Sequence, residues 1–168
     1  MDPINLKNTL KKGGKVYGTM LWGIDSARLT SFLDSEYLDY AIIEAEHAPR
    51  TLYQINSMTT ALRNKNITSI VRITSPNPEI AGATIDAGAD GILVPYCENI
   101  EELKLSFGRT YFNPLKGEYL KKVLDTGEFP SKKSEDYLRE KSKSRLFILG
   151  VESVPAVDNL ENMINSVE

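Results

Sequence analysis

The sequence predicts an α/β fold in which helices cover a parallel β-sheet. Segments rich in β-branched residues alternate with segments of helical periodicity, and the strand segments are apolar nearly throughout their length. The chain has 168 residues, of which 41% are hydrophobic, and this is enough for one domain with a buried core. We therefore expect a single domain over residues 1–168.

The first three strands are bounded by turn and cap signals. Residues 16–21 follow a Gly-Gly pair, residues 40–43 end in a polar group, and residues 67–73 stop at a Ser-Pro-Asn-Pro sequence. One helix is expected to start at Asp25 or Ser26, and the next at Thr51. Their apolar side chains recur at helical spacing: Leu29, Phe32 and Leu33 in the first helix, and Leu52, Ile55, Met58 and Leu62 in the second.

The second half of the chain continues this alternation and then interrupts it. We expect a short helix over residues 80–87, a strand over 91–94 and a helix from the cap Asn99 to about Phe107. A fifth strand over residues 146–151 and a closing helix over 154–167 end the sequence. Residues 113–134 are expected to form an irregular excursion, because they contain two prolines and two glycines, and the charged segment 132–145 a solvated helix.

Composition argues against several classes of function. The formal net charge of -3 gives no global attraction to nucleic acid or to an anionic membrane. Cys97 is the single cysteine, so the chain has neither an internal disulfide nor a cysteine-based zinc site. No apolar run is long enough for a signal peptide or a membrane span, and dinucleotide and P-loop motifs are missing. We expect a cytoplasmic protein.

Polar residues follow three of the predicted strands. Glu44, Glu46 and His47 follow the second, Arg72 ends the third, and Glu152 follows the fifth. Reacting groups of parallel α/β folds lie at the carboxyl ends of strands, so these side chains are candidates for a site. Each also has a structural interpretation. His47 could be a surface residue, Arg72 could form an ion pair with Glu44 or Glu46, and Glu152 could cap a helix.

Five segments around these residues carry a family resemblance. In chain order they are Tyr17-Gly18-Thr19, Glu46-His47-Ala48-Pro49, Val71-Arg72, the sequence DAGADGILVP at residues 86–95, and Val151-Glu152-Ser153. Together they resemble the HpcH/HpaI aldolase family, which consists of metal-dependent aldolases acting on 2-oxo acids. The resemblance implies a (β/α)8 barrel of the TIM type, of which this chain would contain about five of the eight βα units.

The resemblance also implies the chemistry of a class II aldolase, which reversibly cleaves a hydroxy-2-oxo acid to pyruvate and an aldehyde. By this analogy Arg72 contacts pyruvate and its enolate, and His47 serves in acid–base catalysis. Glu44 takes the place of the carboxylate that orients the histidine. Glu152 is one of two carboxylate ligands of a divalent cation, Mg²⁺ or Mn²⁺. A homo-oligomer is expected as well.

Three positions depart from the family pattern. Glu44 stands where the family usually has aspartate, Gly150 where it has glutamine, and Glu118 follows Gly117 where it has an Arg-Gly pair. The chain is also shorter than the about 250 residues of a complete barrel. These departures leave a second hypothesis open, namely a truncated, non-catalytic relative or a binding protein on the same scaffold.

Overall fold

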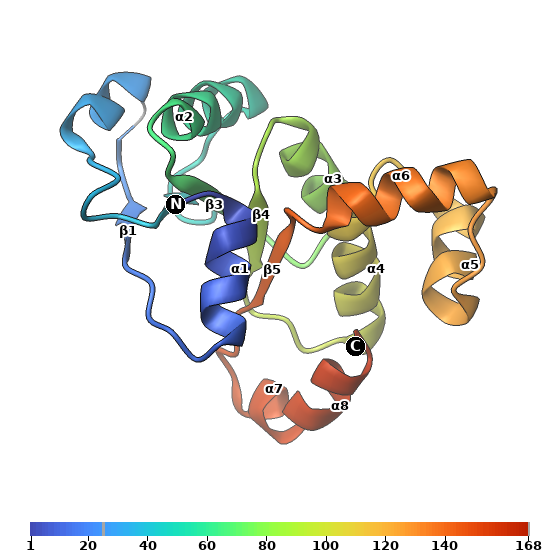
Figure 1. The fold of residues 1–168 in the computed structure, drawn as a ribbon. Coiled ribbons are helices and arrows are strands. Elements are labelled where there is room, and N and C mark those ends of the chain that lie inside the picture. The colour runs from blue at the N-terminus through green and yellow to red at the C-terminus, as the bar shows by residue number, and fades with distance from the viewer. Residues whose placement is uncertain (25, 168) are drawn as a thin grey trace.

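Five parallel strands form one sheet in the computed structural model, which describes residues 1–24 and 26–167 (Figure 1). They are β1 (Gly18–Leu21), β2 (Tyr40–Glu44), β3 (Thr68–Arg72), β4 (Gly91–Val94) and β5 (Leu146–Leu149). Their order in space is their order in the chain, and each neighbouring pair is parallel. Successive parallel neighbours of this kind form the wall of a (β/α) barrel, and the predicted α/β fold is confirmed.

Eight α-helices and one 3₁₀ helix are found among the described residues. They are α1 (Pro3–Lys11), η1 (Ala27–Phe32), α2 (Leu52–Asn64), α3 (Pro78–Asp86), α4 (Ile100–Tyr111), α5 (Gly117–Thr126), α6 (Lys132–Ser142), α7 (Val154–Asp158) and α8 (Leu160–Asn165). Side-chain oxygens cap several of these helices in the way the sequence predicts. Thr51 forms a capping box with Gln54, and the Asn99 side chain accepts hydrogen bonds from the first turn of α4.

The two faces of the sheet bury different sets of side chains, because successive strand residues point to opposite faces. Ile43, Val71 and Ile92 face α2, α3 and α4 and belong to the larger apolar core. Ile70 and Leu146 face the other way and pack with Leu6 of α1. Figure 1 shows α1 in front of the sheet, beside β4 and β5. This helix therefore covers part of the face that a closed barrel would enclose.

The N-terminal helix α1 was not among the elements expected from the sequence. Asp2 starts it, since its carboxylate accepts hydrogen bonds from the backbone N–H groups of Ile4 and Asn5. Pro3 occupies the first turn, where a missing N–H costs nothing. The combination of an acidic cap and a following proline was the available signal, and Leu6 is the side chain that anchors the helix to the sheet.

The segment expected to be an irregular excursion, residues 113–134, contains a helix of three turns. α5 buries Leu120 and Val123 and ends at Gly127, whose φ of 70° is the left-handed conformation of a helix C-cap. It packs on α4 at Gly108, where a β-carbon would lie 2.8 Å from Leu124. Pro114, Gly117 and Pro130 thus lie outside the helix or at its start. Figure 1 shows α5 and α6 next to α4.

Two other expected helices differ in type or length. The segment after β1 is the 3₁₀ helix η1, capped by Ser26, and Phe32 is 85% exposed instead of buried; Asp25 lies outside the described residues. The closing helix is divided at Asn159 into α7 and α8. Tertiary packing decides both outcomes, because Ala156 and Met163 are buried in the core while Phe32 stays exposed.

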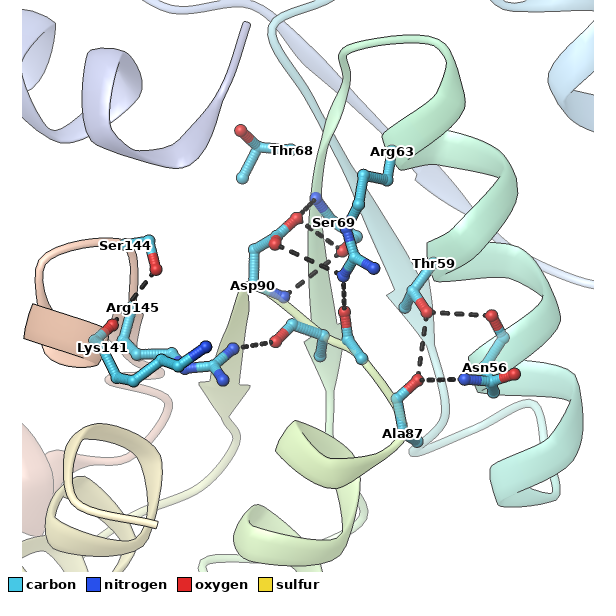
Figure 2. A network of polar contacts seen from close by, with 12 residues as sticks. Asn56, Thr59, Arg63, Thr68, Ser69, Ala87, Asp90, Lys141, Ser144 and Arg145 are labelled. Atoms are coloured by element: carbon cyan, nitrogen blue, oxygen red, sulfur yellow. Dashed lines mark hydrogen bonds and ion pairs between the residues drawn. The ribbon is translucent and has the colours of Figure 1, made fainter. Parts of the chain in front are cut away.

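A network of polar contacts joins the amino-terminal ends of β3 and β4, at the end of the sheet opposite to the predicted site (Figure 2). The Asp90 carboxylate accepts hydrogen bonds from the backbone N–H and the hydroxyl of Ser69, at 2.9 and 2.8 Å. Arg63 lies 3.8 Å from its other oxygen and donates to the carbonyl of Gly88. Arg145 donates to the carbonyl of Ala89. These contacts hold the turn between α3 and β4.

None of the helices in the described part of the chain is both long enough and apolar enough to cross a membrane.

Candidate functional site

The polar residues at the ends of β2 and β3 meet at the carboxyl edge of the sheet. Glu44 and Arg72 are the last residues of their strands and lie opposite each other in the parallel register. Both point to the same face as Ile42 and Ile70, because they are two residues further along each strand. The predicted clustering of these strand ends is therefore present for Glu44, Glu46, His47 and Arg72.

Glu44 is the centre of this cluster and is completely buried. Its Oε2 accepts a hydrogen bond from Nε of Arg72 at 2.6 Å, and its Oε1 accepts from the backbone N–H groups of Glu46 and His47 at 2.8 and 2.9 Å. Burial by itself would raise the pKa of Glu44. The N–H of His47 and the side chain of Arg72 outweigh that effect and hold the pKa below its usual value.

Glu46 connects the guanidinium to the imidazole. Its Oε2 lies 3.3 Å from Nε of Arg72 and 3.6 Å from Nε2 of His47. This oxygen is buried and accepts no hydrogen bond from a described residue. The His47 ring is exposed and stacks with Trp22, with 6.0 Å between ring centroids. The cluster therefore places an accessible imidazole beside a partly buried guanidinium.

The role expected for Glu44 toward His47 differs from the one observed. The family pattern suggested that a carboxylate at this position orients the imidazole, whereas the Glu44 carboxylate contacts only the backbone N–H of His47. The carboxylate that lies near the ring is that of Glu46. The physical reason is that Glu44 lies in the strand with its oxygens turned toward Arg72 and the following loop, so that both are already occupied.

Arg50 is a residue of this region that the sequence analysis did not single out. Its Nε donates to the carbonyl of Glu44 at 2.8 Å, and a terminal nitrogen donates to the carbonyl of Leu21 at 3.2 Å. Arg50 thereby connects the last residues of β1 and β2. A basic residue shortly after a strand end is the only sequence signal for this role, and that signal is weak.

Glu152 lies at the same edge of the sheet, beyond the end of β5, and is exposed. Its Oε1 is 3.4 Å from the backbone N of Tyr96, which follows β4. A β-carbon on Gly150 would lie 2.6 Å from this oxygen and 2.8 Å from the carbonyl oxygen of Val94. The Glu152 carboxylate can therefore occupy this position only because residue 150 has no side chain. Among the described residues no hydrogen bond or ion pair joins Glu152 to Arg72 or His47.

The donor atoms of the cluster favour binding of a small anion. Both carboxylate contacts of Arg72 are made through Nε. In the described part of the chain, no protein acceptor is assigned to its two terminal nitrogens. A guanidinium held in this way presents a planar pair of N–H donors that matches a carboxylate or a 2-oxo acid.

The described residues supply only part of a metal site. Within the described ranges, no group of three or more His, Cys, Asp or Glu side chains is placed to hold a metal ion. Glu152 offers a single carboxylate there. A lone carboxylate falls short of the six or more oxygen ligands that Mg²⁺ and similar hard cations collect from protein and water together. The described residues therefore fit one ligand of such a site and do not form the site itself.

Comparisons with known proteins agree with this fold. The family described as HpcH/HpaI aldolase/citrate lyase matches residues 19–168. The chain is 25% identical over 135 residues to a 5-keto-4-deoxy-D-glucarate aldolase of Enterobacter sp. (strain 638), covering 79% of this chain and 51% of that protein. It is 24% identical over 162 residues to a hydroxypyruvate/pyruvate aldolase of Roseovarius nubinhibens, covering 94% and 61%.

A solved structure has the same fold. The HpcH/HpaI aldolase from Desulfitobacterium hafniense superposes with a TM-score of 0.75 at 22% identity, covering 95% of this chain and 61% of that one. This likeness shows the shared architecture alone. The chain spans 51% to 61% of the length of the relatives named here.

Proposed function

The chain belongs to the HpcH/HpaI aldolase/citrate lyase family, and on that premise we propose that it acts as a metal-dependent carbon–carbon lyase. The proposed reaction is that of a class II aldolase, the reversible cleavage of a hydroxy-2-oxo acid to pyruvate and an aldehyde. The observation that carries the proposal is Arg72, whose contacts with the carboxylates of Glu44 and Glu46 are both made through Nε. The names of the aldolase relatives support the same class of reaction.

Arg72 is proposed to bind the 2-oxo acid. Its terminal N–H groups donate to the carboxylate or keto oxygen of the substrate, and its fixed charge stabilises the enolate oxygen that forms as the bond breaks. Glu44 keeps the guanidinium in place, because its buried carboxylate holds Nε at 2.6 Å. A positioned charge of this kind needs no reorganisation during the reaction.

His47 is proposed to move the proton. In the cleavage direction it accepts the hydroxyl proton through a water molecule. The adjacent carbon–carbon bond breaks, the aldehyde leaves, and the bond electrons form the enolate of pyruvate, which is then protonated at carbon. The exposure of the ring allows such a water to approach. Glu46 lies 3.6 Å from Nε2, on the side of the ring that also faces Arg72.

Glu152 is proposed as one oxygen ligand of a divalent cation, Mg²⁺ or Mn²⁺, since hard cations prefer carboxylates. When bound, such an ion polarises the keto oxygen as a Lewis acid. The described residues supply one such ligand and no cluster, so the steps above are assigned to the side chains of the chain itself. A homo-oligomeric state and a cytoplasmic location accompany the proposal as predictions from the sequence.

Enolisation of pyruvate is the half-reaction that tests the proposal. In D₂O with Mg²⁺, the protein is expected to accelerate exchange of the pyruvate methyl protons, followed by proton NMR. Arg72→Ala should lower the exchange rate by about 100-fold or more, the usual cost of removing a donor from an enolate-stabilising site. Arg139→Ala is the matched control, because Arg139 lies on α6 and pairs with Glu135.

Circular dichroism distinguishes the possible causes of an inactive Arg72→Ala variant. A folded variant without exchange supports the proposed role, whereas an unfolded one shows that Arg72 is a structural ion-pair residue. Exchange at the uncatalysed rate, both in the 168-residue chain and in any naturally longer form, contradicts the lyase.

The second candidate function is a non-catalytic relative or binding protein on this scaffold. The observation that favours it is the arrangement of Glu152, which lies over Gly150 as a single carboxylate. This function predicts that Mg²⁺ and Mn²⁺ leave the melting temperature unchanged, because a ligand stabilises only a folded state that binds it. A rise of the melting temperature that saturates with the metal concentration excludes it.

A further inference from the structure

A cleft of about 380 Å³ lies between α1 and the end of α6. Its polar lining consists of side chains from α1, the end of α4 and the end of α6, namely Lys7, Asn8, Lys11, Tyr111, Ser142 and Lys143. α1 packs through Leu6 against Ile70 and against Leu146, the first residue of β5. The helix thus lies over the amino-terminal part of this strand, away from the carboxyl edge that holds Arg72 and His47.

The charge of this cleft is opposite in sign to that of the chain. Among the described residues, three lysines and no carboxylate line it, whereas the whole chain has a formal net charge of -3. Lys7 and Lys11 are four residues apart on α1, so their ammonium groups lie on the same face of the helix. Lys143 has an ion pair with Glu140, at 2.5 Å, but the Glu140 side chain is exposed and does not line the cleft.

Lys7 is the best-fixed cation of the three. Its Nζ lies 5.2 Å from the centre of the Tyr111 ring and donates to the carbonyl of Ser142 at 3.3 Å. Burial, and after it the charge of Lys11, lowers the pKa of Lys7. Like charges held together in a partly buried cleft repel each other, and an anion placed between them converts this repulsion into attraction.

We propose that this cleft is a binding site for a small molecule that carries a phosphate group. Ammonium groups are common phosphate ligands in proteins, and three of them, with the amide of Asn8, provide several charge-assisted donors. The volume of the cleft lies near the lower end of the range for small-molecule sites. The ligand would bind near the amino-terminal end of β5, away from the carboxyl edge that holds the proposed catalytic cluster, so the site is independent of the aldolase proposal.

Inorganic phosphate is the probe for this site, and a double variant is the comparison. Titration of phosphate into the 168-residue chain at constant ionic strength, followed by isothermal calorimetry and by amide NMR shifts, is expected to saturate. The shifts should concentrate on α1 and on the residues around Tyr111 and Ser142. Lys7→Gln/Lys11→Gln should weaken binding by about tenfold or more, equivalent to about 1.4 kcal/mol.

Lys132→Gln/Lys133→Gln is the matched control, because it removes the same charge at the other end of α6. This control is needed since phosphate also stabilises folded proteins by exclusion from their surface. Circular dichroism shows that each variant is folded. Retained affinity in the control together with loss in the Lys7 and Lys11 variant supports the site. Non-saturating shifts, equal affinity in all three proteins, or shifts that spread over every basic surface overturn it.

Discussion

The two ends of β3 both hold a carboxylate of a neighbouring strand or turn, but they use it differently. At the amino-terminal end, Oδ2 of Asp90 accepts two hydrogen bonds from Ser69, and its Oδ1 faces Arg63 (Figure 2). At the carboxyl end, the carboxylates of Glu44 and Glu46 contact Arg72 through Nε, and Oε2 of Glu46 is buried and accepts no hydrogen bond from the residues that the structure describes. Both oxygens of Asp90 thus have partners in the first network, whereas the second contains a buried oxygen without a described hydrogen bond.

Under the proposed function, this difference separates the end of the sheet that stabilises the fold from the end that is expected to bind substrate. Buried polar groups in native proteins nearly always have a hydrogen-bond partner, so one that has only ion-pair contacts calls for an explanation. In barrels of this type the carboxyl ends of the strands carry the reaction, and the opposite ends contribute stability. The contrast within β3 follows that division. Substitutions at its two ends are therefore expected to differ in how strongly they affect stability and activity.

The largest effect is expected from Glu44→Gln. The change removes the buried carboxylate at 2.6 Å from Nε of the partly buried Arg72 and leaves Glu46, at 3.3 Å, as its second carboxylate partner. Breaking a buried ion pair from one side costs about 3 kcal/mol at the lower end of its range, which applies here because Glu46 remains. The free energy of unfolding, measured by urea denaturation, should fall by that amount. Glu140→Gln on the exposed face of α6 is the control, with an expected change within about 0.5 kcal/mol. An equal, small change in both variants would show that the ion pair contributes nothing to stability.

A smaller loss of stability is expected from Asp90→Ala. The backbone N–H and hydroxyl of Ser69 lose their acceptor, and an unpaired buried polar group costs about 1–3 kcal/mol. The exchange of pyruvate methyl protons per folded molecule should stay unchanged, because this network lies at the opposite end of the strand. A variant that keeps its stability but loses exchange of the methyl protons would contradict a purely stabilising role for the Asp90 network.

The smallest effect is the pH dependence contributed by Glu44. Its pKa is lower in the folded protein than the ordinary value of 4.5, so its contribution to stability is complete above that value. The contribution is lost as the pH falls toward the folded pKa, since the unfolded chain then binds more protons. Between pH 7 and pH 4 only part of it disappears. Urea denaturation over this range should show a shallower decline for Glu44→Gln than for the unchanged protein.

Much of the candidate site could be predicted because its residues lie at strand ends, and strand ends are marked by residues close to them in the sequence. Glu44 and Arg72 end apolar strands, and parallel neighbours bring such ends to one edge of the sheet. The bonding of Glu44 to Arg72 and to the backbone of His47, with Glu46 nearest to the ring, could not be read from spacing. Side-chain rotamers and the path of the loop decide those contacts, and both depend on the packed neighbours.

The sequence by itself determined the alternation of strands and helices, the parallel sheet, most helix starts and the family. Periodicity, caps and turn residues act within a few positions of each other, so they are legible in the chain. The tertiary structure decided the rest. It placed α1 on the sheet face of Ile70 and Leu146 through Leu6, and it folded residues 117–126 into α5 against Gly108. Both depend on contacts with residues distant in sequence, whose burial supplies the free energy that local preference lacks.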